Sequence, residues 1–314
     1  MPREGMMGLR RALGSTRVPL LSDLVLMSQM MLARRTSGFL LESRPGEFGS
    51  PIPNLKEIRQ RERSIFDVDV PLAAINLRED EQLELVGKLS ELYQDQPFGG
   101  HRKEGLRYYP ENDFFGVGEA FTLHCILRLY RPERIVEVGS GFSSAVILDT
   151  NDLFMGGDLS CTFIDPNPKR LTALLSPEDK RRVIVRAEAI QQTPLAVFDE
   201  LEDGDVLFID SSHVSKVGSD LNRLIFDVLP RLQPGVIVHF HDIYYPFEYP
   251  KEWVFKGRAW NENYILRAFL MFNNSFDILL FNAWLDRFHS PLIAQTMPMW
   301  AENIGTSLWL QRAG

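Results

Sequence analysis

Carboxylates and imidazoles follow two short apolar runs of this sequence, and these residue types can perform acid–base or metal chemistry. Asp210 comes directly after the first run and is followed by two serines and His213. His241 and Asp242 come at the end of the second run. Two carboxylates and an imidazole are suitable ligands for Mg²⁺, Mn²⁺ or Fe²⁺. We therefore expect a divalent-metal site formed by Asp210, His241 and Asp242.

A second group of residues has the types and spacing of a nucleotide-binding loop. Gly139 and Gly141 follow a predicted strand and precede a helix, so the backbone can approach a ligand near a helix N-terminus. The dinucleotide fingerprint requires a third glycine where this chain has Ser144. Glu137 would repel a pyrophosphate and attract a cationic amino group. Asp165, after the next predicted strand, can accept hydrogen bonds from both ribose hydroxyls.

Each of these residues also has a purely structural interpretation. Glu137 could interact with a helix dipole, and Asp165 could be a turn residue. His213 could cap the following helix, and His239 is better explained as a hydrogen-bonded histidine of the core. If no metal binds, the same acids and imidazoles could form a general base and a polar clamp for the substrate. Residues 243–260 are rich in aromatics and form either a pocket wall or a packed loop.

Alternating apolar runs and helical patterns predict the elements that position these residues. Continuous apolar runs separated by helices indicate a parallel sheet that is covered on both faces, with ligands beyond the carboxyl ends of its strands. Residues 276–281 and 306–310, separated by an irregular stretch, would add an antiparallel pair at one edge. The prediction is an α/β fold, a doubly wound, seven-stranded, mostly parallel sheet. The five parallel strands are expected at residues 134–138, 161–164, 182–185, 205–209 and 236–238.

The first hundred residues differ in character from the rest of the chain. Residues 1–50 carry a net charge of +3, which leaves −11 for the remainder. Residues 18–32 have the pattern of an amphipathic helix, residues 44–53 that of a linker, and residues 55–66 and 79–93 that of two more helices. We predict a helical N-terminal extension over residues 1–100, which could mediate homo-oligomerisation, and a main domain over residues 101–314.

Composition excludes several classes of protein. A net charge of −8 argues against a general nucleic-acid binder. Cys125 and Cys161 are the only cysteines, so a disulfide framework and a zinc ribbon are excluded, and a reducing cytoplasmic location is expected. Residues 18–32 are too short and too polar to span a bilayer, which needs about 20 apolar residues.

The glycine loop and the acid after the second strand resemble the cofactor motifs of class I S-adenosylmethionine-dependent methyltransferases. The resemblance covers roughly residues 105–312 and implies a Rossmann-like fold. It implies that Glu137, Gly139, Gly141 and Ser143 lie around the methionine moiety and that Asp165 holds the ribose. Ser143 stands where many members of the family carry a third glycine. Residues 208–213 and 239–250 are similar to a largely uncharacterised bacterial group of small-molecule methyltransferases.

The strand-end acids are similar in placement to those of metal-dependent O-methyltransferases of the catechol type. That similarity implies catalysis by Asp210 and by His213, which would serve as the base for an acceptor hydroxyl. The predicted function is S-adenosylmethionine-dependent methyl transfer to a hydroxyl of a small molecule or glycoconjugate precursor. One alternative is a metal-dependent oxygenase or lyase on the same scaffold, because two imidazoles and a carboxylate suit Fe²⁺. Another is a cofactor-binding partner protein without catalysis.

Overall fold

The computed structural model describes residues 28, 43 and 45–314, and the helix predicted at residues 18–32 lies almost wholly outside them. The chain divides into two compact units, Met1–Glu57 and Ile58–Gly314. The sheet and the candidate site belong to the second unit. Within that unit Gln82 donates a hydrogen bond to the Leu77 carbonyl and accepts one from the Phe281 amide. The domain boundary expected near residue 100 stays a prediction.

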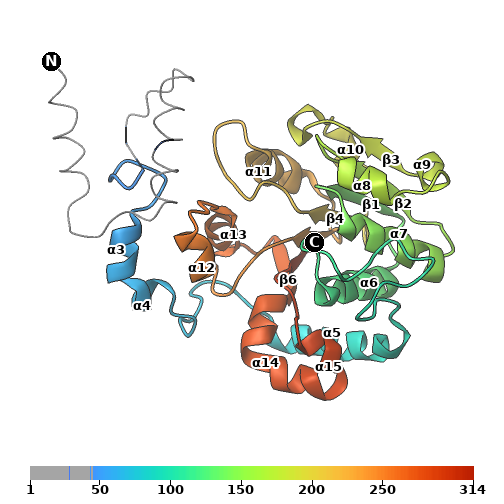
Figure 1. Cartoon of the computed structure of the whole chain (residues 1–314), viewed down its shortest axis with the longest axis horizontal. Coiled ribbons are helices and arrows are strands. Elements are labelled where there is room, and N and C mark those ends of the chain that lie inside the picture. Colours follow the sequence, from blue (N-terminus) through green and yellow to red (C-terminus); the bar gives the residue numbers. More distant parts are fainter. Residues whose placement is uncertain (1–27, 29–42, 44) are drawn as a thin grey trace. The chain divides into compact units, whose positions relative to one another are not determined.

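Seven strands form one sheet, as the sequence predicts (Figure 1). Their order is β3-β2-β1-β4-β5-β7-β6, with β7 antiparallel to both of its neighbours and the first five strands parallel. Strands β1 to β3 extend toward one edge of the sheet and the later strands toward the other. The order therefore reverses between β1 and β4, and ligands bind at this point in doubly wound folds. The strands are β1 Arg134–Val138, β2 Ser160–Ile164, β3 Ile184–Arg186, β4 Val206–Ile209, β5 Ile237–Phe240, β6 Phe276–Phe281 and β7 Leu308–Arg312.

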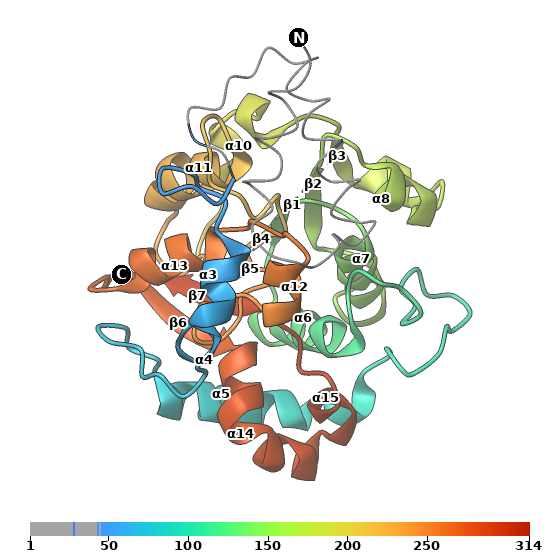
Figure 2. The same ribbon diagram turned by 60° about the vertical axis from the view of Figure 1, so that its left-hand side comes forward.

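Helices lie on both sides of the sheet, with α7 on one side and α11 on the other in two views (Figures 1 and 2). The helices before and between the parallel strands are α3 Leu55–Gln60, α4 Glu62–Ile65, α5 Glu79–Glu91, α6 Val117–Tyr130, α7 Phe142–Phe154, α8 Lys169–Leu174, α9 Asp179–Arg182, α10 Ala196–Asp199 and α11 Asp220–Arg223. Those after the fifth strand are α12 Lys251–Phe255, α13 Glu262–Leu270, α14 Asn282–Thr296 and α15 Pro298–Ala301. Short 3₁₀ turns occupy Tyr93–Asp95, Ile190–Gln192 and Leu229–Arg231, and a π-helical turn occupies Leu224–Val228.

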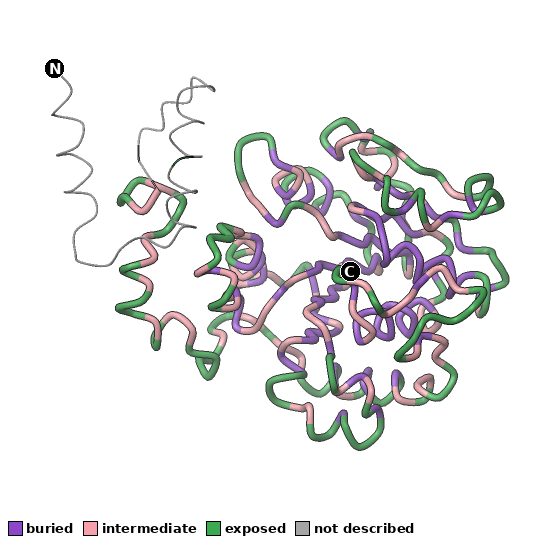
Figure 3. Tube along the Cα trace, in the orientation of Figure 1, coloured by how far each residue is buried: buried purple, intermediate pink, exposed green. Residues whose placement is uncertain are grey.

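The core lies between the sheet and these helices, and burial is concentrated in the central strands (Figure 3). Every residue of β4 and β5 is buried, which explains why both are apolar except for His239 of β5. The polar side chains at the ends of these strands are therefore held by a rigid, dehydrated framework.

Several local predictions differ from the structure, among them the last strand, predicted at residues 306–310 and found at Leu308–Arg312, and the fifth, predicted at 236–238 and found at Ile237–Phe240. The third strand begins at Ile184 rather than residue 182, because Arg182 completes α9, and this edge strand is largely exposed. The helix predicted at residues 55–66 is broken at Arg61 into α3 and α4. The stretch between the last two strands is helical rather than irregular. It forms α14, which contains Pro291, and α15, which starts at Pro298, and these prolines obscure the helical period in the sequence.

In the part of the chain that the structure describes, no helix combines the length and apolarity needed to cross a membrane.

Candidate active site

The loop after β1 approaches the end of β4 so closely that only glycine fits at its first position. Gly139 has φ +83°, and a Cβ placed on it would lie 1.8 Å from the Asp210 carbonyl oxygen. The glycine therefore allows the predicted cofactor loop and the predicted catalytic acid to meet at one point of the sheet edge.

Asp165 connects this loop to the end of β2. The amide and the hydroxyl of Ser140 both donate to Asp165 Oδ2, at 3.0 and 3.1 Å, and the Asn167 amide donates to Oδ1 at 2.7 Å. These bonds orient the carboxylate at the edge of a cavity that Ser140 and Asp165 both line. The two Ser140 donors occupy both lone pairs of Oδ2, and Oδ1 retains a lone pair for a ligand hydroxyl.

Glu137 lies beneath the loop rather than in the cavity. Its carboxylate is fully buried and accepts hydrogen bonds from the hydroxyls of Ser143 and Ser144 at the start of α7. Burial raises the pKa of Glu137 to about 8, although the two hydroxyls oppose the shift. The role predicted for Glu137 beside the cofactor stays a prediction. Any influence on a ligand would pass through Ser143, which does line the cavity.

The four residues predicted at the catalytic edge come together. Asp210 Oδ1 lies 3.4 Å from His213 Nε2 and 3.5 Å from His241 Nδ1. Asp242 Oδ2 lies 4.0 and 3.7 Å from the same two nitrogens. Asp210, His213 and His241 each offer a ligand atom within 4.8 Å of the others, a separation suited to one metal ion. The described residues thus supply two carboxylates and two imidazoles around one centre.

Each imidazole has a buried carboxylate on its outer side. Glu262 Oε2 is 2.7 Å from His213 Nδ1, and Glu119 Oε1 is 3.0 Å from His241 Nε2. Glu262 is the first residue of α13, and Glu119 lies in the first turn of α6, where it also accepts from the Gly116 amide. An outer carboxylate fixes the orientation of an imidazole, so that its other nitrogen faces the shared centre.

The charges of this cluster shift its protonation strongly. Burial alone would lower the pKa of His213, but Asp210 and Glu262 outweigh it and raise the pKa to about 10. Burial also opposes protonation of His241, yet Glu119 and Asp210 raise its pKa well above the usual value. Burial would raise the pKa of Asp210, while His241 and His213 hold it far below its usual range. In the absence of a cation, the cluster therefore holds protonated imidazoles against ionised acids.

Two of these residues also have unusual backbone conformations. His213 and Asp242 have φ values of +59° and +58°, in the left-handed region that non-glycine residues rarely adopt. The His213 carbonyl accepts hydrogen bonds from the amides of Asn261 and Glu262, at 3.1 and 3.3 Å, which hold the strained turn in place. Such strain is typical of functional sites.

His239 lies apart from this cluster. Its Nε2 is 2.9 Å from the Ser307 hydroxyl, and its ring stacks on Phe208 at a centroid distance of 3.7 Å. Burial lowers its pKa well below the usual value, so the ring is neutral. These contacts agree with the interpretation of His239 as a core histidine.

One cavity of about 710 Å³ joins the two ends of the site. It is lined on one side by the glycine loop and Asp165, and on the other by the two aspartates and two histidines of the catalytic edge. Three aromatics of the predicted wall also line it, namely Tyr244, Trp253 and Trp260. Others from the same segment, such as Phe247, are buried in the core. Residues 243–260 therefore form part of the pocket wall and also pack on the core, so both interpretations of this segment hold.

Sequence reasoning missed four charged residues of the site. The sequence does not indicate a role for Glu119 or Glu262, because each lies in a helix and is far along the chain from the histidine that it contacts. Arg170 and Arg258 line the cavity but have no motif around them. An acid among the small and apolar residues that begin α6, Val117–Phe121, was the one available signal for Glu119.

Comparison with known proteins identifies the family. A methyltransferase-domain model matches residues 136–243, which run from β1 to just beyond β5. An uncharacterised protein of Archaeoglobus fulgidus is 35% identical over 170 residues, which make up 51% of this chain and 73% of the relative. Together with the sheet order, these matches show that the chain belongs to the class I S-adenosylmethionine-dependent methyltransferases.

Solved structures with a similar arrangement include two methyltransferases. The Podospora anserina methyltransferase PaMTH1 bound to SAH is 14% identical, with a TM-score of 0.44 over 85% of this chain and 100% of the other. The O-methyltransferase TomG from Streptomyces achromogenes, in complex with SAM, is also 14% identical, with a TM-score of 0.38 over 82% of this chain and 96% of the other. At these TM-scores neither structure bears on the acceptor of this chain.

Proposed function

We propose that this methyltransferase transfers the methyl group of S-adenosylmethionine to a hydroxyl of a small molecule, with the assistance of a divalent metal. The observation that carries the proposal is the cluster at the catalytic edge. Asp210 and Asp242 converge with two carboxylate-backed histidines in the cavity that Gly139, Gly141 and Asp165 also line. When bound, S-adenosylmethionine supplies the methyl group, and a divalent metal lowers the pKa of the acceptor hydroxyl.

The residues of the cluster fit a metal. His241 Nδ1 is buried and forms no hydrogen bond, although two carboxylate oxygens lie within 4 Å of it. Without a metal, a proton on this nitrogen offsets the two acids, and a divalent cation at the same place would take the lone pair of Nδ1 and offset them instead. We assign Asp210, His241 and Asp242 as the ligands, and Glu119 as the residue that orients His241.

We assign the proton transfer to His213. Glu262 holds its Nδ1, so the Nε2 that faces the cavity is the nitrogen available to the acceptor. A cation beside Asp210 would oppose protonation of this ring and restore a neutral base. Gly139, Gly141, Ser143 and Asp165 are assigned to the cofactor, which the open loop geometry and the oriented carboxylate of Asp165 support.

Calorimetry with metal and cofactor tests the proposal. We expect the metal-free protein to bind both S-adenosylmethionine and Mn²⁺. The Asp210→Asn variant should lose at least about tenfold in Mn²⁺ affinity and in methyl transfer while it still binds the cofactor. The matched control is Asp227→Asn, which changes an exposed acid paired with Arg223 outside the cavity. Full turnover by Asp210→Asn, or by wild-type protein stripped of metal, would show that no metal takes part.

The donor set also favours a second candidate, a metal-dependent oxygenase or lyase on this scaffold. Asp210, His213 and His241 together have the composition of two imidazoles and one carboxylate, which suits Fe²⁺. Metal analysis of the purified protein distinguishes the two functions. Bound iron with oxygen uptake would support the oxygenase, and turnover with Mg²⁺ or Mn²⁺ in the absence of oxygen would support methyl transfer.

A further inference from the structure

Arg258 is a cation on the aromatic wall of the cavity, and no described acid pairs with it. Its guanidinium carbon lies 3.9 Å from the centroid of the Trp253 ring and 4.9 Å from that of Trp260. The salt bridges of the described residues include none to Arg258, whereas other arginines of this unit, such as Arg107, Arg134 and Arg182, each have a carboxylate partner. Contact with two ring faces holds the guanidinium in place and leaves its N–H edges free.

The wall also places Arg258 on the catalytic side of the cavity. Trp260, which Arg258 contacts, packs on the His213 ring at a centroid distance of 4.2 Å. The other cavity arginine, Arg170, belongs to the cofactor side. Its Cδ lies 2.8 Å from where a Cβ on Gly141 would be, and its guanidinium carbon is 3.6 Å from the Phe114 ring centroid. The two arginines therefore face different halves of one cavity.

The charges of the catalytic half explain what a free cation there would do. A divalent metal would offset the charges of Asp210 and Asp242 and leave little net positive charge at the metal centre, so a carboxylate of the acceptor needs a separate cation away from it. A planar guanidinium can form two parallel hydrogen bonds with a carboxylate, a geometry that the ammonium of lysine cannot reproduce. Tyr244, Trp253 and Trp260 line the cavity beside Arg258, and aromatic side chains of this kind suit a planar ring between that carboxylate and the reacting hydroxyl.

We propose that Arg258 binds a carboxylate of the methyl acceptor and that the acceptor is a hydroxylated aromatic acid. This inference rests on methyl transfer to a hydroxyl, as proposed above. It assigns Arg258 to substrate specificity and leaves metal and cofactor binding to the residues already named.

Radiolabelled methyl transfer to matched acceptors tests the assignment. The probes are 3,4-dihydroxybenzoate and 4-hydroxycinnamate, each compared with its neutral primary amide. With the wild-type protein we expect kcat/KM for an acid to exceed that for its amide by about tenfold or more. The Arg258→Gln variant should remove this preference by lowering turnover of the acids alone. Arg258→Lys should restore only part of the preference, because lysine returns the positive charge but cannot form two parallel hydrogen bonds with a carboxylate.

Arg102→Gln is the matched control. Arg102 is another exposed arginine over an aromatic ring, 4.8 Å from the Tyr109 centroid, and it does not line the cavity. This variant should keep the preference for acids. Equal turnover of acids and amides by the wild type, or an equal loss with both classes in Arg258→Gln, would overturn the inference.

Binding measurements separate the failure of this inference from that of the proposed function. Calorimetry of Arg258→Gln with S-adenosylmethionine should give the wild-type affinity. A loss of cofactor affinity would show that Arg258 holds the cofactor's carboxylate instead, and would overturn the inference. A wild-type protein that binds cofactor and metal but methylates neither acid would contradict the acceptor class alone. Absence of cofactor or metal binding would contradict the proposed function itself.

Discussion

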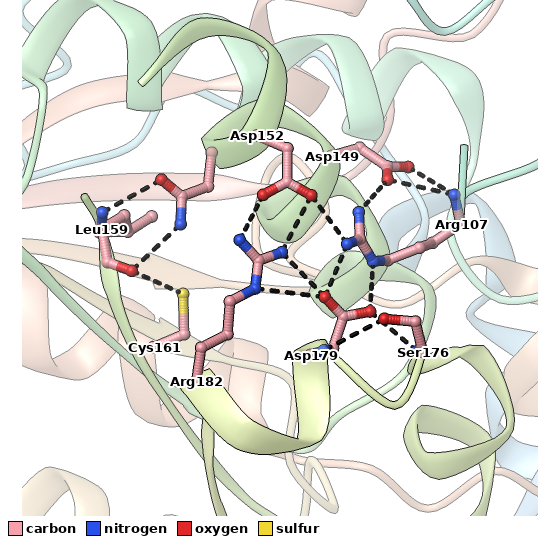
Figure 4. A network of polar contacts seen from close by, with 9 residues as sticks. Arg107, Asp149, Asp152, Leu159, Cys161, Ser176, Asp179 and Arg182 are labelled. Atoms are coloured by element: carbon pink, nitrogen blue, oxygen red, sulfur yellow. Dashed lines mark hydrogen bonds and ion pairs between the residues drawn. The ribbon is translucent and has the colours of Figure 1, made fainter. Parts of the chain in front are cut away.

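Two clusters of charged side chains in this domain differ in how completely their members are hydrogen-bonded to one another. Around Arg107 every charged group is satisfied: its guanidinium donates to Asp149, Asp152 and Asp179 at 2.6 to 2.8 Å (Figure 4). The backbone amides of Arg107 and Tyr108 donate to Asp149 as well. At the catalytic edge, by contrast, the acids and imidazoles that face each other are 3.4 to 4.0 Å apart.

The difference indicates what each cluster does. The Arg107 network joins the segment before α6 to α7 and α9, and each of its charged groups has an oppositely charged partner. The catalytic edge is tightly hydrogen-bonded only on its outer side, through Glu119 and Glu262, and its inner side is open to the cavity. Complete pairing indicates a structural role, whereas pairing on one side only leaves groups free for chemistry.

The largest expected effect is loss of stability from the paired cluster. Arg107→Gln should lower the free energy of unfolding by about 3 to 5 kcal/mol, because it leaves the buried Asp149 and Asp179 without their main cation. Chemical denaturation measures the change. The control is Arg231→Gln, which breaks an exposed pair with Asp199 and should cost at most about 1 kcal/mol. Equal effects of the two variants would show that the Arg107 network contributes no special stability.

A substitution at the open cluster should act on function instead. In Asp242→Asn the amide oxygen can still accept from Thr306 and Tyr244, as Asp242 Oδ1 does at 3.2 and 3.4 Å. The fold is therefore kept while one negative charge is lost. We expect metal affinity and kcat/KM to fall together by about tenfold to hundredfold, with an unchanged melting temperature. A lower melting temperature with normal metal affinity would place Asp242 among the structural groups.

A third, smaller effect distinguishes the core histidine of α6 from those of the site. His124 is buried with its Nδ1 3.0 Å from the Thr150 hydroxyl, and burial, with a minor contribution from Arg128, lowers its pKa to about 3. The unfolded chain binds a proton near pH 6.5 and the folded chain does not, so stability is full above that pH and falls below it. The loss attributable to His124 should reach about 2 kcal/mol at pH 5.

Comparison with His124→Gln measures this contribution. The variant should lose less stability between pH 7.5 and pH 5 than the wild type, by that amount. An identical pH dependence in both proteins would mean that His124 does not titrate as described.

Most of the fold was predictable from local pattern, because strands buried on both faces are mostly apolar. The predicted runs 134–138, 205–209 and 236–238 identified three central strands and therefore the edge to which Gly139, Asp210 and His241 belong, although the last of these strands extends to Phe240. Residues at the exposed edge were less predictable, and the third strand was placed two residues early. Helix α14 was missed because a proline interrupts its pattern.

Only those residues of the site that follow the ends of parallel strands were predictable from the sequence. Parallel strands bring their carboxyl ends to one edge, so Asp210, His213, His241 and Asp242 could be grouped without coordinates. The outer acids could not be found in this way, because Glu119 and Glu262 arrive from helices 122 and 49 residues away from the histidines that they contact.

The sequence by itself thus determined the sheet, the glycine loop and the residues of the catalytic edge, since hydrophobic period and chain order decide which strand ends are neighbours. The tertiary structure alone decided how charge is distributed there. It buried Glu137 beneath the loop, placed a carboxylate behind each catalytic-edge histidine and set Arg258 on its aromatic wall. Those contacts join residues distant along the chain, and the packing of helices on the sheet, rather than any local pattern, specifies them.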